Sequence, residues 1–261
     1  MVHNSLRCAN ISVDQFRQLL SEYDGLLESI STTKPTKQGQ QTLAELDKFR
    51  YETAVKLFGS EEPKRAMQHD DVKSLVEWKF DRRHGKFRPT LMKLVASNDT
   101  DFVSDTIAGA MSAYWKAPDA SKALDGIAKL KGVGPATASL LLSVHDPGSV
   151  IFFSDEAYYW LCHDAKMCPI KYNAREYQDL NSATQKLVER LGVSATDIEK
   201  VAYVVMRKTH DDATSPRREP SPPLSQRGST PSGERGHKRK FDGESKDVAP
   251  PQLRRSQRGK T

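Results

Sequence analysis

The stretch Leu130-Lys131-Gly132-Val133-Gly134-Pro135-Ala136-Thr137-Ala138 decides the expected fold, because it joins two apolar runs through a glycine-rich turn. Apolar residues recur at helical spacing before it, and a strongly apolar run follows it. Glycine allows the backbone conformations of a tight turn, and a proline at the first position of a helix loses no hydrogen bond. The stretch therefore predicts a helix-hairpin-helix over about residues 119–145.

The predicted turn is a candidate anion site. Its amides lie at the start of a helix, where unpaired N–H groups and the helix dipole favour negative charge. A phosphate of a nucleic-acid backbone supplies both the charge and the acceptor atoms. We assign this contact to the following residues: Lys131, Gly132, Val133, Gly134, Ala136 and Thr137. The alternative is an ordinary helical corner that binds no ligand.

The composition indicates a protein of a reducing compartment. The chain has 261 residues, of which 37% are hydrophobic and 28% charged, and its apolar runs are too short for a membrane span. We expect no signal peptide at Met1. The three cysteines, Cys8, Cys162 and Cys168, cannot form a secreted disulfide framework. The cytosol or the nucleus is the expected location.

The charge is concentrated near the C-terminus. From Asp211 onward there are 12 Lys or Arg against 7 Asp or Glu, which leaves 28 of the 40 basic and 27 of the 34 acidic residues for 1–210. Residues 211–261 are rich in Pro, Ser, Arg and Gly, so we expect a disordered basic tail. Its cluster Lys238, Arg239 and Lys240 predicts a nuclear import signal, and a merely solubilising tail is the alternative.

Residues 1–210 predict a single all-α domain. A Ser12/Gln15 capping box opens the first helix, and a Ser194/Asp197 box opens the last. The other helices are expected at about 43–57, 70–80, 89–98, 101–115, 156–163 and 174–190, with a loop at about 31–41. The last helix is expected to end near Lys208.

The region around the hairpin resembles the helix-hairpin-helix superfamily of base-excision DNA glycosylases, over about residues 114–163. The resemblance rests on a helix, the Lys-Gly-Val-Gly turn, a Thr-Ala helix, a short apolar return, and an acidic residue that opens an aromatic-rich helix. It implies a multi-helix glycosylase-like fold in which an aspartate about twenty residues past the hairpin carries catalysis. The matching residue is Asp155, and Glu156 is the alternative because a one-residue shift would exchange them.

The chemistry of such a site can be stated from physical principles. Cleavage of an N-glycosidic bond builds positive charge on the sugar, which a nearby carboxylate stabilises. The target base must leave the helical stack and enter a pocket. Tyr158, Tyr159 and Trp160, which follow the acid closely, are the candidate pocket residues, and Phe152 and Phe153, which precede it, are further candidates for stacking. If the chain has no catalytic activity, Asp155 would instead place a negative charge at the N-terminus of its helix, where the helix dipole favours it. The aromatic residues would then pack in the hydrophobic core.

Departures from the superfamily pattern restrict the expected activity. Bifunctional members carry a Schiff-base lysine where this chain has Ala136, so the resemblance implies a monofunctional hydrolase. The chain lacks the four clustered cysteines of an iron–sulfur cluster. A zinc site of Cys162, His163 and Cys168 has a weak spacing signal, and buried or incidental thiols are the alternative. We expect no side-chain metal site and no organic cofactor; an alkali ion on the turn's backbone carbonyls is implied for this family.

A second basic segment suggests further nucleic-acid contact. Arg82, Arg83, Lys86 and Arg88 lie close together, interleaved with phenylalanines. A solvated turn between two helices is the alternative.

Taken together, these patterns predict a nuclear, monomeric protein that binds duplex DNA and no membrane, with or without glycosylase activity. One alternative is a non-catalytic helix-hairpin-helix module that binds DNA or chromatin. A weaker one is a helical protein-interaction domain.

Overall fold

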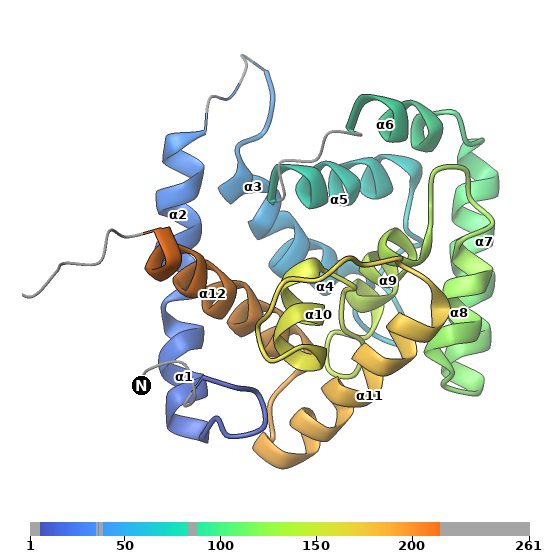
Figure 1. Ribbon diagram of the computed structural model, residues 1–261. Coiled ribbons are helices and arrows are strands. Elements are labelled where there is room, and N and C mark those ends of the chain that lie inside the picture. The colour runs from blue at the N-terminus through green and yellow to red at the C-terminus, as the bar shows by residue number, and fades with distance from the viewer. Residues whose placement is uncertain (1–5, 35, 37–38, 83–87, 215–261) are drawn as a thin grey trace, which may run out of the picture. The chain divides into compact units, whose positions relative to one another are not determined.

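All regular elements are helical in the part of the chain that the computed structural model describes, residues 6–34, 36, 39–82 and 88–214. The all-α class is therefore confirmed. In chain order (Figure 1) the elements are α1 (Val13–Ser21), α2 (Tyr23–Thr33), α3 (Leu43–Lys48), the π-helical segment η2 (Phe49–Thr53), α4 (Ala54–Phe58), α5 (His69–Arg82), α6 (Arg88–Ala96), α7 (Thr100–Lys116), α8 (Ala120–Ile127), α9 (Pro135–His145), α10 (Asp155–Cys162), α11 (Ala174–Leu191) and α12 (Ala195–Thr214). Within these ranges, every helix is too short or too polar to cross a bilayer.

Both predicted capping boxes are present. The Gln15 amide donates to Ser12 Oγ at 3.2 Å, and the Ser12 amide donates to Gln15 Oε1 at 3.0 Å. Ser194 and Asp197 make the equivalent pair of contacts at the start of α12. Each box satisfies backbone donors that a helix start leaves without intrahelical partners. The sequence therefore sets where these helices begin.

Two helix ends differ from the expected positions. Helix α2 continues to Thr33, into the segment predicted as a loop, because the buried side chains of Leu27 and Ser31 hold it against its neighbours. Helix α12 continues past Asp211 to Thr214, beyond the expected end near Lys208. Both segments were predicted to be non-helical because they are rich in polar residues. Local polarity is a weak guide to the end of a helix when packing against neighbouring helices can extend it by another turn.

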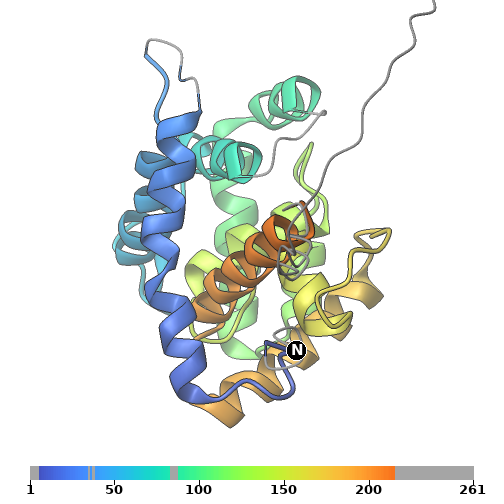
Figure 2. The same cartoon turned by 60° about the vertical axis from the view of Figure 1, so that its left-hand side comes forward.

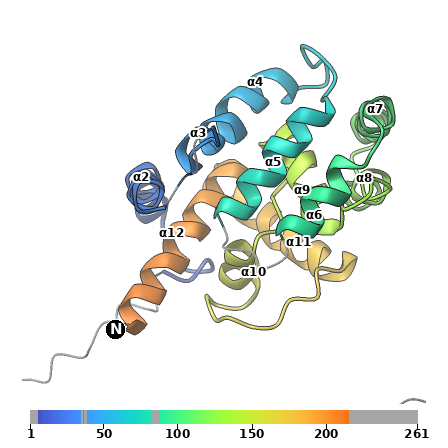
Figure 3. The same cartoon turned by 90° about the horizontal axis from the view of Figure 1, so that it is seen from above.

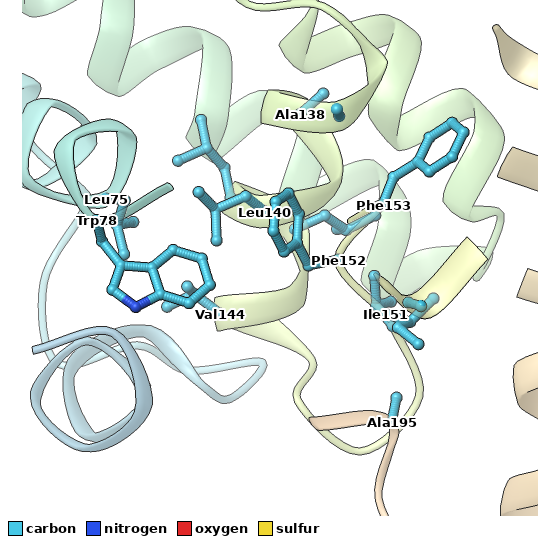
Figure 4. Packing of buried hydrophobic residues seen from close by; sticks show 14 of the residues in the cluster. Leu75, Trp78, Ala138, Leu140, Val144, Ile151, Phe152, Phe153 and Ala195 are labelled. Atoms are coloured by element: carbon cyan, nitrogen blue, oxygen red, sulfur yellow. The ribbon is translucent and has the colours of Figure 1, made fainter. Parts of the chain in front are cut away.

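Helix α9 is the centre of the fold. All its residues from Ala136 to His145 are buried, as expected for a helix that is apolar around its whole circumference. It contacts α4, α5 and α8 (Figure 3). Figure 4 shows Phe152, from the segment that returns after α9, beside Leu140 and Trp78. The Phe152 and Trp78 ring centroids lie 5.6 Å apart. The return segment is thus part of the core rather than a surface loop.

Helix α12 forms the second half of the packing. It contacts α1, α2, α10 and α11, and Figure 2 shows it crossing beside the α1–α2 pair. Its apolar side chains from Ile198 to Val205 are almost wholly buried. Helices α7 and α8 pack on one another at the side opposite to α2 (Figure 3).

A charge cluster is buried between α5, η2 and α12. Arg82 Nη1 donates to Glu199 Oε1 at 2.7 Å, and Arg50 Nη2 lies 3.4 Å from Glu199 Oε2. The Tyr51 hydroxyl donates to Glu199 Oε1 at 2.7 Å. Arg50 and Tyr51 are consecutive residues of the π-helical segment η2, and both contact this carboxylate. We call Arg50, Arg82 and Glu199 the buried charge cluster.

Candidate nucleic-acid interface and active site

The turn between α8 and α9 requires glycine at position 132. Gly132 has φ of +76°, a conformation that side chains other than glycine rarely adopt. A Cβ atom there would lie 2.9 Å from Leu94 Cβ and 3.1 Å from the Val95 amide nitrogen, so α6 leaves no room for one. Gly132 is therefore fixed by the fold itself, whatever the turn binds.

Asn98 holds the same turn from the other side. Its Nδ2 donates to the Lys131 carbonyl at 2.9 Å, and the Lys131 amide donates to its Oδ1 at 2.8 Å. Its Nδ2 also reaches the Val95 carbonyl at 2.9 Å, which ties the turn to the end of α6. The sequence analysis missed this residue. An asparagine after a helix signals only a local cap, and nothing in the sequence connects it to a turn 33 residues away.

Some backbone amides of the turn are paired and others are not. The Lys131 and Val133 amides donate to Asn98 and to the Leu130 carbonyl, respectively. Within the described part of the chain, no acceptor is found for the amides of Gly132, Gly134 and Ala136. The side chains of Val133, Ala136 and Thr137 are buried. A ligand at this turn would thus meet backbone rather than side chains.

The fold constrains Gly134 less than Gly132. It is the exposed N-cap of α9 with φ of −94°, a value open to any residue. A Cβ atom built there has no other atom within 4 Å. The described residues therefore leave the space over Gly134 open.

A small cavity of about 130 Å³ lies beside the start of α9. Its described lining comes from α5, α9, α10 and the segments before and after α10: Lys79, Arg82, Ala136, Phe152, Phe153, Ser154, Asp155, Glu156 and Tyr172. Both candidate acids line it, and so does Ala136 from the hairpin. Two residues that are 19 apart in sequence, Ala136 and Asp155, are therefore brought to one place.

Asp155 is the first residue of α10, directly after the N-cap residue Ser154. Ser154 caps the helix, since its Oγ accepts from the Ala157 amide at 3.1 Å. The Tyr172 hydroxyl donates to Asp155 Oδ1. Tyr172 has φ of +54°, and its ring lies 5.3 Å from that of Phe153. The segment after α10 thus brings an aromatic hydroxyl onto the carboxylate and fixes its orientation.

The basic groups of the cavity come from α5. Lys79 Nζ donates to Thr137 Oγ1 at 2.8 Å, so it bridges α5 to the first turn of α9. Burial opposes the positive charge of Arg82, but the hydroxyls of Tyr51 and Tyr23, followed by the carboxylates of Glu199 and Glu156, hold its pKa well above the ordinary value. The cavity therefore combines two cations with two carboxylates.

The predicted aromatic pocket is formed only in part by the predicted residues. Trp160 is fully buried, and its indole N–H donates to the Leu6 carbonyl at 2.7 Å. Tyr158 lines a separate cavity of about 610 Å³ beside Cys8 and Cys162. Neither these two residues nor Tyr159 is among the described lining of the Asp155 cavity. Phe152 and Phe153, which precede Asp155 in the sequence, line it together with Tyr172.

Of the second predicted basic patch, the structure describes the side chain of Arg82 alone. Arg82 is only 2% exposed and belongs to the buried charge cluster, so it cannot form part of a solvated phosphate surface. Arg88 begins α6, while Arg83 and Lys86 lie outside the described residues. Lys238, Arg239 and Lys240 also lie outside them. Exposed lysines near the turn are Lys93, Lys129 and Lys131.

No metal centre is evident at the cysteines. Among the residues that the structure describes, no three His, Cys, Asp or Glu side chains are grouped to hold an ion. Burial raises the pKa of Cys162 to about 12, with Asp179 and the other two thiols adding to the effect. The Cys162 thiol is therefore protonated at neutral pH.

Comparison of the chain with family models, with characterised proteins and with solved structures finds no significant match.

Proposed function

We propose that this protein binds duplex DNA through the α8–α9 turn and hydrolyses an N-glycosidic bond at Asp155. The observation that carries the proposal is the shared cavity: Ala136, from the turn's own helix, and Asp155 both line it. A backbone phosphate on the turn would therefore lie within reach of a carboxylate. Amides for the phosphate and an acid for the sugar are the two groups that the chemistry needs.

The anchoring step uses backbone rather than base contacts. The amides of Gly132, Gly134 and Ala136 would donate to phosphate oxygens, with Lys93, Lys129 and Lys131 nearby for charge. Such contacts hold a duplex without reading its sequence. They are compatible with an enzyme that acts wherever a target base is found.

The hydrolytic step assigns a role to each cavity residue. As the bond from C1′ to the base nitrogen breaks, the bonding electrons leave with the base, and the Asp155 carboxylate stabilises the cationic sugar. Water supplies the oxygen that bonds to C1′. The proton that it releases passes to the carboxylate and balances the one that the departing base takes up. Tyr172 keeps the carboxylate in position through its hydroxyl.

The proposal is for a monofunctional enzyme. Position 136 carries only a methyl group, so it has no amine with which to attack the sugar. Lys79 is the lysine among the described lining of the cavity, and its Nζ is engaged by Thr137. Strand cleavage together with a borohydride-trapped adduct would contradict hydrolysis and would point to Lys79.

Entry into the nucleus remains a prediction from Lys238, Arg239 and Lys240.

A pair of glycine variants tests the anchoring step. Gly134→Ser should leave the fold intact, because serine is a preferred N-cap and its Cβ meets open space. It should weaken duplex binding about tenfold, because the new side chain keeps phosphate from the amides. Fluorescence anisotropy with a labelled duplex at low salt measures the affinity.

Two further variants complete that experiment. Gly132→Ala should lower the free energy of unfolding by about 1–2 kcal/mol or more, since it forces a positive φ and a contact with α6. Gly25→Ser, on the exposed face of α2, is the control and should leave DNA affinity unchanged. Equal affinity of the folded Gly134→Ser variant and the wild type would refute the role of the turn.

A further inference from the structure

A further cavity, of about 330 Å³, lies between α7 and the segment that connects α4 to α5. Its wall is largely apolar and includes Met67, Ile107, Met111 and Trp115, and His145 lines it from the end of α9. The described lining of this cavity shares no residue with that of the Asp155 cavity. A mostly apolar cavity of this size that contains a buried polar group is typical of a small-molecule site.

His145 uses one of its two ring nitrogens within the fold. Its Nδ1 lies 2.8 Å from the Leu141 carbonyl oxygen. A carbonyl oxygen can only accept, so Nδ1 carries the hydrogen of this bond. Burial lowers the pKa of His145, and the imidazole is therefore neutral at pH 7. In this tautomer Nε2 holds a lone pair, and it acts as a hydrogen-bond acceptor.

The Nε2 atom of His145 is accessible from the cavity. Among the described residues, none donates a hydrogen bond to it. It is also not one of the unpartnered polar atoms in this part of the chain that are closed to solvent, although the residue as a whole is only 4% exposed. Because His145 lines the cavity, its small accessible part, Nε2 included, faces that space. A ligand with a donor group would complete the pairing of the ring.

The apolar wall favours an aromatic ligand. The buried thioethers of Met67 and Met111 provide polarisable sulfur, which contacts the edges of aromatic rings favourably. Trp115 adds an indole ring, which can pair with a second ring by offset or edge-to-face contact. An apolar cavity of about 150 Å³ takes up one benzene molecule. The volume of about 330 Å³ therefore has room for two fused rings.

The rim favours a neutral ligand. Glu61 and Lys116 are both exposed and have opposite charges, and the charge of Arg65 is paired with Asp71 at 2.6 Å. The rim thus attracts neither sign strongly. A charged group would also lose its hydration against the apolar wall without a charged partner at the depth of His145.

We propose that this cavity binds a small neutral aromatic molecule of two fused rings, whose N–H or O–H donates to His145 Nε2. Indole is the simplest molecule with these properties. The site is independent of the proposed function, because its described lining has no residue in common with the Asp155 cavity.

A matched pair of ligands tests the hydrogen bond on the wild-type chain. Indole carries a ring N–H, and 1-methylindole has the same rings without the donor. We expect indole to bind about tenfold more tightly. In an NMR titration it should also shift the ¹⁵N signal of His145 Nε2. His69 is the internal control, because its Nε2 lies 2.8 Å from the Val95 carbonyl oxygen and is already paired.

A pair of alanine substitutions on α7 tests the location. Ala108 is exposed and lines the cavity, so Ala108→Phe should obstruct the entrance and weaken indole binding about tenfold or more. Ala113 is exposed on the same helix but lines a different groove. Ala113→Phe is therefore the matched control and should leave the affinity for indole unchanged. Thermal melting followed by circular dichroism checks that both variants fold.

Each contrary result overturns a stated part of the proposal. Equal affinity of indole and 1-methylindole, or a His145 signal that does not move at saturation, would refute the bond to Nε2. Equal affinity of the folded Ala108→Phe variant and the wild type would refute the location, and no binding of indole would refute the site. Tighter binding of N-acetyltryptophan amide than of indole would reassign the cavity to a tryptophan side chain of a partner protein. Base release at Asp155 is measured separately and is decided by none of these results.

Discussion

Replacing Asp155 by asparagine is expected to slow base release about a hundredfold or more. The variant keeps the shape of the side chain and an oxygen that can accept from Tyr172, but it loses the charge that stabilises the cationic sugar. Duplex affinity should be kept or should rise, since a carboxylate near the DNA repels phosphate. Single-turnover release of free base, measured beside duplex affinity, separates the two effects.

Glu156→Gln is the matched control for Asp155→Asn. Both residues lie in the first turn of α10 and line the same cavity. Glu156 lies close enough to Arg82 to help raise the pKa of its guanidinium, whereas the Asp155 carboxylate accepts a hydrogen bond from the Tyr172 hydroxyl. The account therefore predicts the smaller loss of rate for Glu156→Gln. An inactive Glu156→Gln beside an active Asp155→Asn would transfer the catalytic role to Glu156.

Replacing Glu199 by alanine is expected to lower the free energy of unfolding by about 3–5 kcal/mol. The substitution leaves the buried cations Arg50 and Arg82 without their shared carboxylate. It also removes the acceptor of the Tyr51 hydroxyl. Urea unfolding followed by circular dichroism measures the change.

The exposed residue Glu189 on α11 is the control for this variant. Glu189→Ala should change the free energy of unfolding by no more than about 0.5 kcal/mol, as is usual for a surface substitution. If Glu199→Ala cost less than about 1 kcal/mol, the buried charge cluster would not stabilise the fold as described here.

The sequence predicted those parts of the fold that depend on local signals. Capping residues such as Ser12 and Ser194 mark helix starts because they bond to amides three residues away. The glycine-rich turn is also local, and α8 and α9 flank it as expected. The glycosylase-like character of the fold and the DNA-binding role of the turn remain predictions.

The sequence could not predict features that depend on distant contacts. Arg82 forms an ion pair with Glu199, which lies 117 residues further along the chain. Because the sequence does not show this pairing, Arg82 was predicted to belong to an exposed basic patch. Tyr172 was missed as a partner of Asp155, because nothing local indicates that the segment after α10 folds back onto its first residue. Nor does the sequence show that Trp160, five residues after Asp155, lies in the core rather than in the cavity.

The most direct test of the central claim is base release by the wild-type protein. Duplexes that each carry one modified base, an inosine duplex among them, are incubated with the full chain, and mass spectrometry follows free base and strand length. The account predicts free base and an abasic strand that stays intact until alkali treatment. Stable binding of these duplexes without release of any base would contradict it and would favour a non-catalytic DNA-binding module.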